Sequence, residues 1–171
     1  MKSSLTVPSK LSEITLKQYR KYIKISENNT DPYFLQCKMI EIFCNLDSKS
    51  VRLLKLSSAE KVVNTINNMF EDKPRLIRTF KLDGIEYGLI PQLDDMSLGE
   101  YIDLDKNIGD WDNMIIAMNV LYRPISKRIG EKYLINDYNI ETKERLIDIP
   151  IDIVLGVVFF LHNLGIELSK V

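Results

Sequence analysis

The sequence predicts a mainly α chain of the α+β class: a helical bundle with one β-hairpin at about residues 77–90 and a buried C-terminal helix. Two observations predict this fold. Apolar residues recur at helical spacing over most of the chain, and an Asp-Gly pair separates two short alternating runs. The 171 residues, 45% of them apolar, suffice for one packed core. We expect an extended N-terminal arm, 1–11, and a single mostly helical domain, 12–171.

Helix-start signals recur in the first half of the chain. Thr15 with Gln18, and Ser57 with Glu60, match the capping box, in which a hydroxyl and a side chain three residues later bond backbone N–H groups at the helix start. Between them, Asp31 precedes a proline, which pairs a cap with a favoured first-turn residue. We therefore predict that helices begin at these three places.

The hairpin is predicted by Asp83-Gly84, which lies between the alternating runs 79–82 and 85–90. An Asp-Gly pair suits the type I′ turn because both central residues of that turn need a positive φ. Pro91 ends the second run, since proline cannot donate to a strand ladder.

Two short helices are predicted after the hairpin. Ser97 with Glu100 forms another capping box before a helix that reaches about Asp105. A second helix is expected over 110–121, where apolar residues repeat at helical spacing, and Pro124 should stop it.

The last third of the chain gives weaker signals until its final helix. Residues 122–139 have few periodic cues, so we predict irregular structure, with short strands around 133–135 as the alternative. The final helix, 151–169, has a wide apolar arc and should lie at the centre of the core.

Charge divides the chain into two halves despite a net charge of −1. Residues 1–81 hold 15 Lys or Arg and 8 Asp or Glu, whereas residues 82–171 hold 8 and 16. A basic side of the first helix, at i, i+3, i+4 and i+7, is one candidate protein-binding surface: Lys17, Arg20, Lys21 and Lys24. Such a side is most often a solvated face, and the alternatives are contact with an acidic protein surface or with a DNA backbone.

The acidic middle of the chain is the other candidate protein-binding surface. Its members are Asp94, Asp95, Asp103, Asp105, Asp110 and Asp112. If a basic surface of one copy meets an acidic surface of the next, the contact is heterologous and closes into a ring when the rotation allows. We therefore predict a homo-oligomer or ring as one outcome, with DNA contact through the basic N-terminal half as another.

No catalytic or cofactor-binding signature is found in the sequence. It lacks a phosphate loop, a dinucleotide fingerprint and a Gly-x-Ser-x-Gly motif, and acids are plentiful without any feature that selects a pair. His162 is the only histidine, and Cys37 and Cys44 lie about 10 Å apart along one predicted helix, too far for a disulfide. We predict buried free thiols, no metal, no cofactor and no enzymatic activity.

Two other site classes are disfavoured by spacing and length. Counted from Asp103 as an EF-hand loop, glycine falls at the seventh place and Met114 stands where the bidentate glutamate belongs. The longest uncharged apolar run, 153–161, is far shorter than the about 20 residues of a membrane helix. Residues 1–8 lack the apolar segment of a signal peptide, so we expect a reducing compartment and no membrane.

The stretches YGLIP (87–91), DDMSLGEYIDL (94–104), DWDNM (110–114) and LYRP (121–124) resemble a family of small virion-associated proteins of crAss-like tailed bacteriophages. The resemblance extends over roughly residues 11–168. It implies a non-enzymatic cargo or structural protein of the portal and tail region. Its partners would be portal, tail or capsid proteins, and it would occur in the virion and, during assembly, in the host cytoplasm. The alternative is a tail assembly chaperone that is absent from the mature particle.

Overall fold

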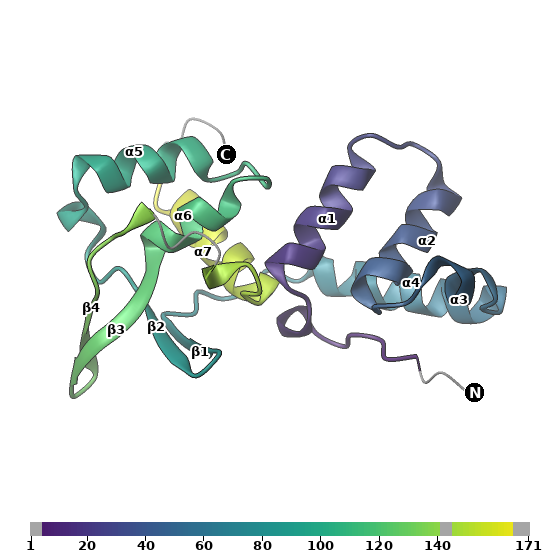
Figure 1. Cartoon of the computed structure of the whole chain (residues 1–171), viewed down its shortest axis with the longest axis horizontal. Coiled ribbons are helices and arrows are strands. Elements are labelled where there is room, and N and C mark those ends of the chain that lie inside the picture. Colours follow the sequence, from purple (N-terminus) through teal and green to yellow (C-terminus); the bar gives the residue numbers. More distant parts are fainter. Residues whose placement is uncertain (1–4, 141–144, 166–171) are drawn as a thin grey trace. The chain divides into compact units, whose positions relative to one another are not determined.

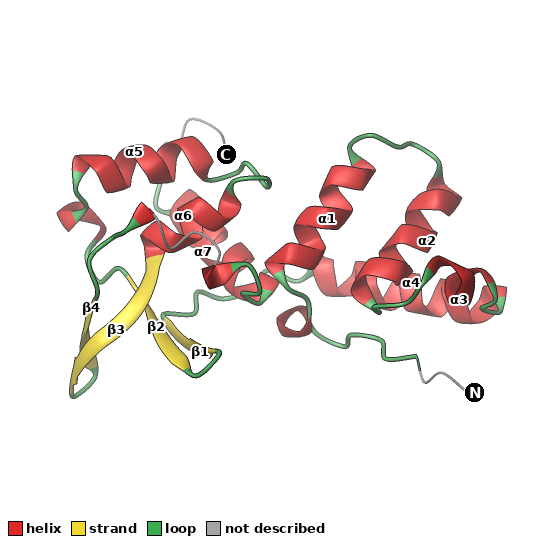
Figure 2. Cartoon of the chain, viewed as in Figure 1, coloured by secondary structure: helices red, strands yellow, loops and turns green. Residues whose placement is uncertain are grey.

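The computed structural model describes residues 5–140 and 145–165, and within them it contains seven α-helices and a four-stranded antiparallel sheet (Figures 1 and 2). The α+β class is therefore confirmed. The contacts between residues divide the chain into two compact units, which we describe separately. The first unit takes in residues 1–73 and 150–152, and the second takes in residues 74–149 and 153–171. The expectation of a single domain stays a prediction.

The first unit is helical in its described part. Residues 5–10 form no helix or strand, and a 3-10 turn, Leu11–Glu13, leads into four helices. These are α1 (Leu16–Ser26), α2 (Pro32–Phe43), α3 (Ser48–Arg52) and α4 (Leu56–Glu71). The helix α2 packs against the other three. Tilted aromatic pairs join α1, α2 and α4, with ring centroids 5.4 Å apart for Tyr19–Phe70 and 5.9 Å for Phe43–Phe70.

Two of the three predicted helix starts in this unit are confirmed. Thr15 and Gln18 form both bonds of the capping box, and Asp31 caps α2. The box at Ser57 is wrong, because α4 begins earlier. The Lys55 carbonyl already accepts the Ala59 N–H at 3.0 Å, so Ser57 lies inside the helix.

The second unit is built on the sheet, whose strands follow the order β1-β2-β3-β4. They are β1 (Thr79–Leu82), β2 (Ile85–Leu89), β3 (Tyr122–Ile129) and β4 (Lys132–Ile135). The first hairpin is confirmed, since Asp83 and Gly84 have φ of 50° and 77°, as a type I′ turn requires.

A helical bundle with only one hairpin is therefore the wrong architecture. Helix α6 (Met114–Leu121) ends as predicted, but the predicted start at 110 is wrong, because residues 110–113 form a turn before it. The chain then passes directly into β3, and Pro124 pairs with Tyr87 inside the sheet. The strands β3 and β4 form a second hairpin, turned at Gly130 with φ of 63°. The short strand considered around 133–135 is confirmed as part of β4. The prediction of irregular structure is wrong for β3, whose outer half is exposed and charged and so lacks apolar alternation.

Three helices complete the second unit: α5 (Leu98–Asn107), α6 and most of α7 (Ile151–Asn163). The capping box of Ser97 and Glu100 is confirmed at the start of α5. The predicted burial of the C-terminal helix is also confirmed, because Ile153, Val154 and Val157 are at most 3% exposed. The helix ends at Asn163, so the predicted helix is wrong at Leu164 and Gly165, which form a turn with φ of 67° at the glycine. The rest of the predicted helix, 166–169, lies outside the described residues.

Glycines allow two close approaches in this unit. A Cβ at Gly156 of α7 would lie 2.4 Å from the Arg75 carbonyl oxygen, so the helix contacts the backbone that precedes β1. A Cβ at Gly88 of β2 would lie 2.4 Å from the Tyr133 ring. That ring crosses β2 and donates its hydroxyl to the Leu89 carbonyl at 2.7 Å, which ties β4 to β2 across β3.

Candidate functional site

The predicted basic residues share an exposed side of α1. Lys17, Lys21 and Lys24 are exposed and Arg20 is half-buried. Lys21 also lies near Glu41 of α2, whose carboxyl group is held mainly by Lys38 at an ion-pair distance of 2.6 Å. The structure therefore brings the four predicted bases together on one helix.

The six predicted acids do not gather into one site. Asp94 and Asp95 are exposed in a 3-10 turn, Leu93–Asp95, ahead of α5. Asp103 and Asp105 are half-buried on α5, whereas Asp110 and Asp112 lie in the turn before α6. Over 5–140 and 145–165, no three Asp, Glu, His or Cys side chains are close enough to hold a metal ion.

Asp103 and Asp110 form hydrogen bonds that support the fold. The Tyr138 hydroxyl donates to Asp103 at 2.9 Å, and burial together with this carboxylate raises the pKa of Tyr138. Asp110 accepts the Asn113 side-chain amide at 2.9 Å and the Asp112 N–H at 3.1 Å, which orders the turn before α6. These two acids help to hold the fold.

The predicted free thiols are confirmed, although only one is buried. Cys44 is buried, and Cys37 is half-buried beside a groove of the first unit. This groove has a volume of about 620 Å³ and is formed by α2, α3 and α4. Its wall includes Tyr33 and Leu56, large apolar side chains that are 75% and 72% exposed.

A buried ion pair lies in the second unit. The Arg123 Nη1 and the Glu100 Oε1 are 2.7 Å apart, and the two residues are only 8% exposed. Glu100 also bonds the N-cap residue of α5, with its Oε2 2.7 Å from the Ser97 backbone nitrogen. Burial alone would raise the pKa of Glu100, but the bonds from Ser97 and the Arg123 charge outweigh it, so that pKa is lowered.

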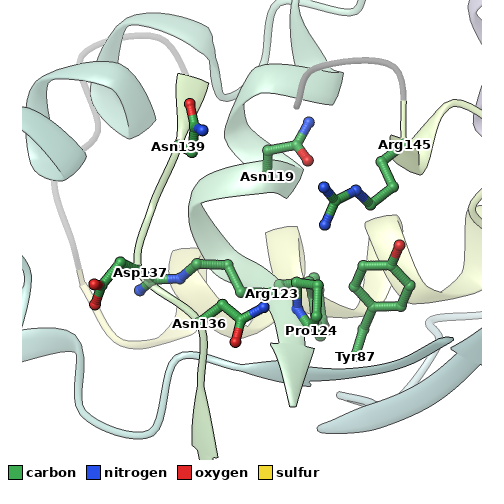
Figure 3. A pocket seen from close by; sticks show the side chains of 9 residues that line it. Tyr87, Asn119, Arg123, Pro124, Asn136, Asp137, Asn139 and Arg145 are labelled. Carbon is green, nitrogen blue, oxygen red and sulfur yellow. The ribbon is translucent and has the colours of Figure 1, made fainter. Parts of the chain in front are cut away.

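Arg123 lies between two cavities of the second unit. One, of about 210 Å³, is lined mainly by polar side chains (Figure 3): Tyr87, Asn119, Tyr122, Arg123, Pro124, Asn136, Asp137, Asn139 and Arg145. We call it the Arg123 cavity. The other, of about 450 Å³, shares Arg123, Asn136 and Asp137 with it.

This site was not predicted from the sequence, although the sequence contains one signal for it. Asn119 and Arg123 are the two strongly polar residues in the apolar run 114–125, and they are four positions apart. A polar residue inside a run that must be buried is informative, because its burial requires a partner. The partners come from distant segments, and so the spacing alone could not identify them.

Comparison of the chain with protein-family models, with curated proteins and with solved structures finds no match. In the part of the chain that the structure describes, no helix has both the length and the apolar character needed to cross a bilayer.

Proposed function

We propose that this chain is a non-enzymatic component of a tailed-phage virion, a cargo or structural protein of the portal and tail region that acts through contacts with other proteins. The family resemblance of its sequence motifs suggests the particle. The observation that carries the proposal is the exposure of a basic side of α1 in the first unit and of the adjacent acids Asp94 and Asp95 in the second unit.

The charged surfaces favour binding to other chains. Lys17, Lys21 and Lys24 of the first unit offer a basic side, and the second unit exposes Asp94 and Asp95. Complementary charges speed association and select the correct partner more than they add affinity. Each surface is therefore suited to recognising an oppositely charged neighbour, including a second copy of this chain.

The groove of the first unit also favours binding to another protein chain. Charged contacts at an interface rim contribute little affinity, whereas large side chains that enter a desolvated pocket contribute most. Tyr33 and Leu56 provide such side chains at the groove. The first unit thus combines an apolar contact area with a charged side on the neighbouring α1.

Charge reversal tests the role of the basic side. We expect the triple variant Lys17→Glu, Lys21→Glu, Lys24→Glu to lose association with its partner, whether a second copy or a virion protein. Analytical ultracentrifugation at low salt measures self-association, and co-purification from infected cells measures hetero-association. Because exposed charges are screened over about 8 Å at physiological salt, the wild-type contact should also weaken as salt is added.

A matched control separates location from net charge. Lys10→Glu, Lys61→Glu and Lys73→Glu change three exposed lysines of the same unit that lie neither on α1 nor in the lining of the groove. This control should retain association. Equal loss in both triple variants, or no loss in either, would contradict a specific contact through α1.

A further inference from the structure

Arg123, which lines the Arg123 cavity, has a buried side-chain donor without a hydrogen-bond partner in the described part of the chain. The Arg123 Nη1 is held by Glu100, but its Nε is buried and has no hydrogen-bond partner among the described residues. A buried N–H without an acceptor costs about 1–3 kcal/mol. An acceptor that enters the cavity and bonds this N–H would remove the cost.

A second guanidinium lines the same cavity. Arg145 is exposed, and Figure 3 shows its side chain entering from the side opposite Asp137. Burial raises the pKa of the Tyr87 phenol, and the positive charge of Arg145 offsets part of this rise. Within 5–140 and 145–165, no carboxylate forms an ion pair with Arg145.

The two arginines differ in the hydrogen-bond donors and the charge that remain available to a ligand. Arg123 is already neutralised by Glu100, so it offers a directed N–H donor. Arg145 offers a planar fork of donors and a positive charge, the arrangement that suits a carboxylate or a phosphate. The Asn136 side chain adds an amide at the cavity wall.

We propose that the Arg123 cavity binds a small oxyanion, a carboxylate or phosphate group, between the Arg123 Nε–H and the Arg145 guanidinium. The oxyanion enters past the exposed Arg145, and a hydrogen bond from the buried Arg123 Nε–H sets how far into the cavity it lies. The volume of about 210 Å³ accommodates a single small group of this kind. This site lies within the second unit, and it does not depend on the proposed role in a virion.

Arginine side-chain NMR tests the proposal directly on the whole protein. Inorganic phosphate and acetate serve as probes in separate titrations, each matched for ionic strength with sodium chloride. We expect at least one probe to shift the Nε–H signals of Arg123 and Arg145, with the signal of Arg52, an exposed arginine of α3, unmoved. A response to one probe alone identifies the oxyanion class.

Two variants locate the binding. Arg145→Gln changes an exposed residue and should weaken the probe about tenfold, which corresponds to about 1.4 kcal/mol. Arg123→Lys retains a charge for Glu100 but removes the Nε–H, so it should weaken binding in a protein that keeps its ion pair. Arg52→Gln, the matched control, should leave binding unchanged.

Three results would overturn the proposal. The first is the absence of any shift of the Arg123 signal with either probe, which would leave water as the occupant. The second is unchanged binding in Arg145→Gln. The third is equal weakening in Arg52→Gln, which would mean that the probe responds to charge in general.

Discussion

At the residue scale, Glu100 combines a local contact at the start of α5 with a long-range ion pair to the buried Arg123. Glu100 completes the capping box of α5 and also meets an arginine 23 positions later in the chain. The first contact is local and was predicted from Ser97 and Glu100. The second depends on how α5, α6 and β3 pack, so no spacing rule reveals it. Asp103 is a further example of a long-range contact, because it accepts a hydrogen bond from the distant Tyr138 hydroxyl.

The pair also predicts how stability changes with pH. Because the pKa of Glu100 is lower in the folded chain than the unfolded value of about 4.3, its contribution is complete above that value. It is lost as the pH falls through the lower, folded pKa. We expect Glu100→Gln to cost about 3–5 kcal/mol at neutral pH, since it leaves the Arg123 charge buried without its partner.

Urea unfolding of this variant at several pH values measures both effects. The stability of Glu100→Gln should depend less on pH than that of the wild type between neutral pH and the acid range. Glu131→Gln is the control, because Glu131 is exposed at the turn between β3 and β4. Equal losses in the two variants would contradict a specific role of the buried carboxylate.

At the element scale, the helices were easier to predict than the sheet. The start of α5 and the first hairpin are set by residues a few positions apart, and both were predicted. The second hairpin was missed because β3 is stabilised by pairing with β2 and by the Tyr133 ring over Gly88. Those contacts join segments that are far apart in the sequence, and they replace the apolar alternation that the outer half of β3 lacks.

Replacing a glycine by alanine is predicted to change the stability in opposite directions in α7 and α5. Gly156→Ala should destabilise the chain by about 1–3 kcal/mol, because the new Cβ meets the Arg75 carbonyl oxygen at 2.4 Å and a backbone atom cannot move away cheaply. Gly99→Ala lies in α5 with nothing within 4 Å of the new Cβ. It should stabilise the chain by about 0.5–1 kcal/mol.

Thermal or urea unfolding distinguishes the two glycine variants. A neutral Gly156→Ala would mean that α7 does not approach the segment before β1 so closely. A destabilised Gly99→Ala would mean that α5 is not helical at that position in solution.

At the scale of the whole molecule, the division of charge along the chain follows directly from the sequence, whereas the exposure of each charged residue depends on the fold. The balance of 1–81 against 82–171 can be counted from the residues, and the structure assigns the basic side of α1 to the first unit. The acids of the second unit, however, divide between exposed positions and bonds that hold the fold. Of the six predicted acids, the adjacent and exposed Asp94 and Asp95 are the ones on which the proposed contact rests.

Mass spectrometry of gradient-purified phage particles from a culture that expresses this chain tests the central claim most directly. Copy number is measured against the major capsid protein. We expect the chain in the particle at a fixed number of copies, as a structural or cargo protein requires. Its presence in the infected-cell lysate with none in the particle would contradict the account and would instead favour the tail assembly chaperone.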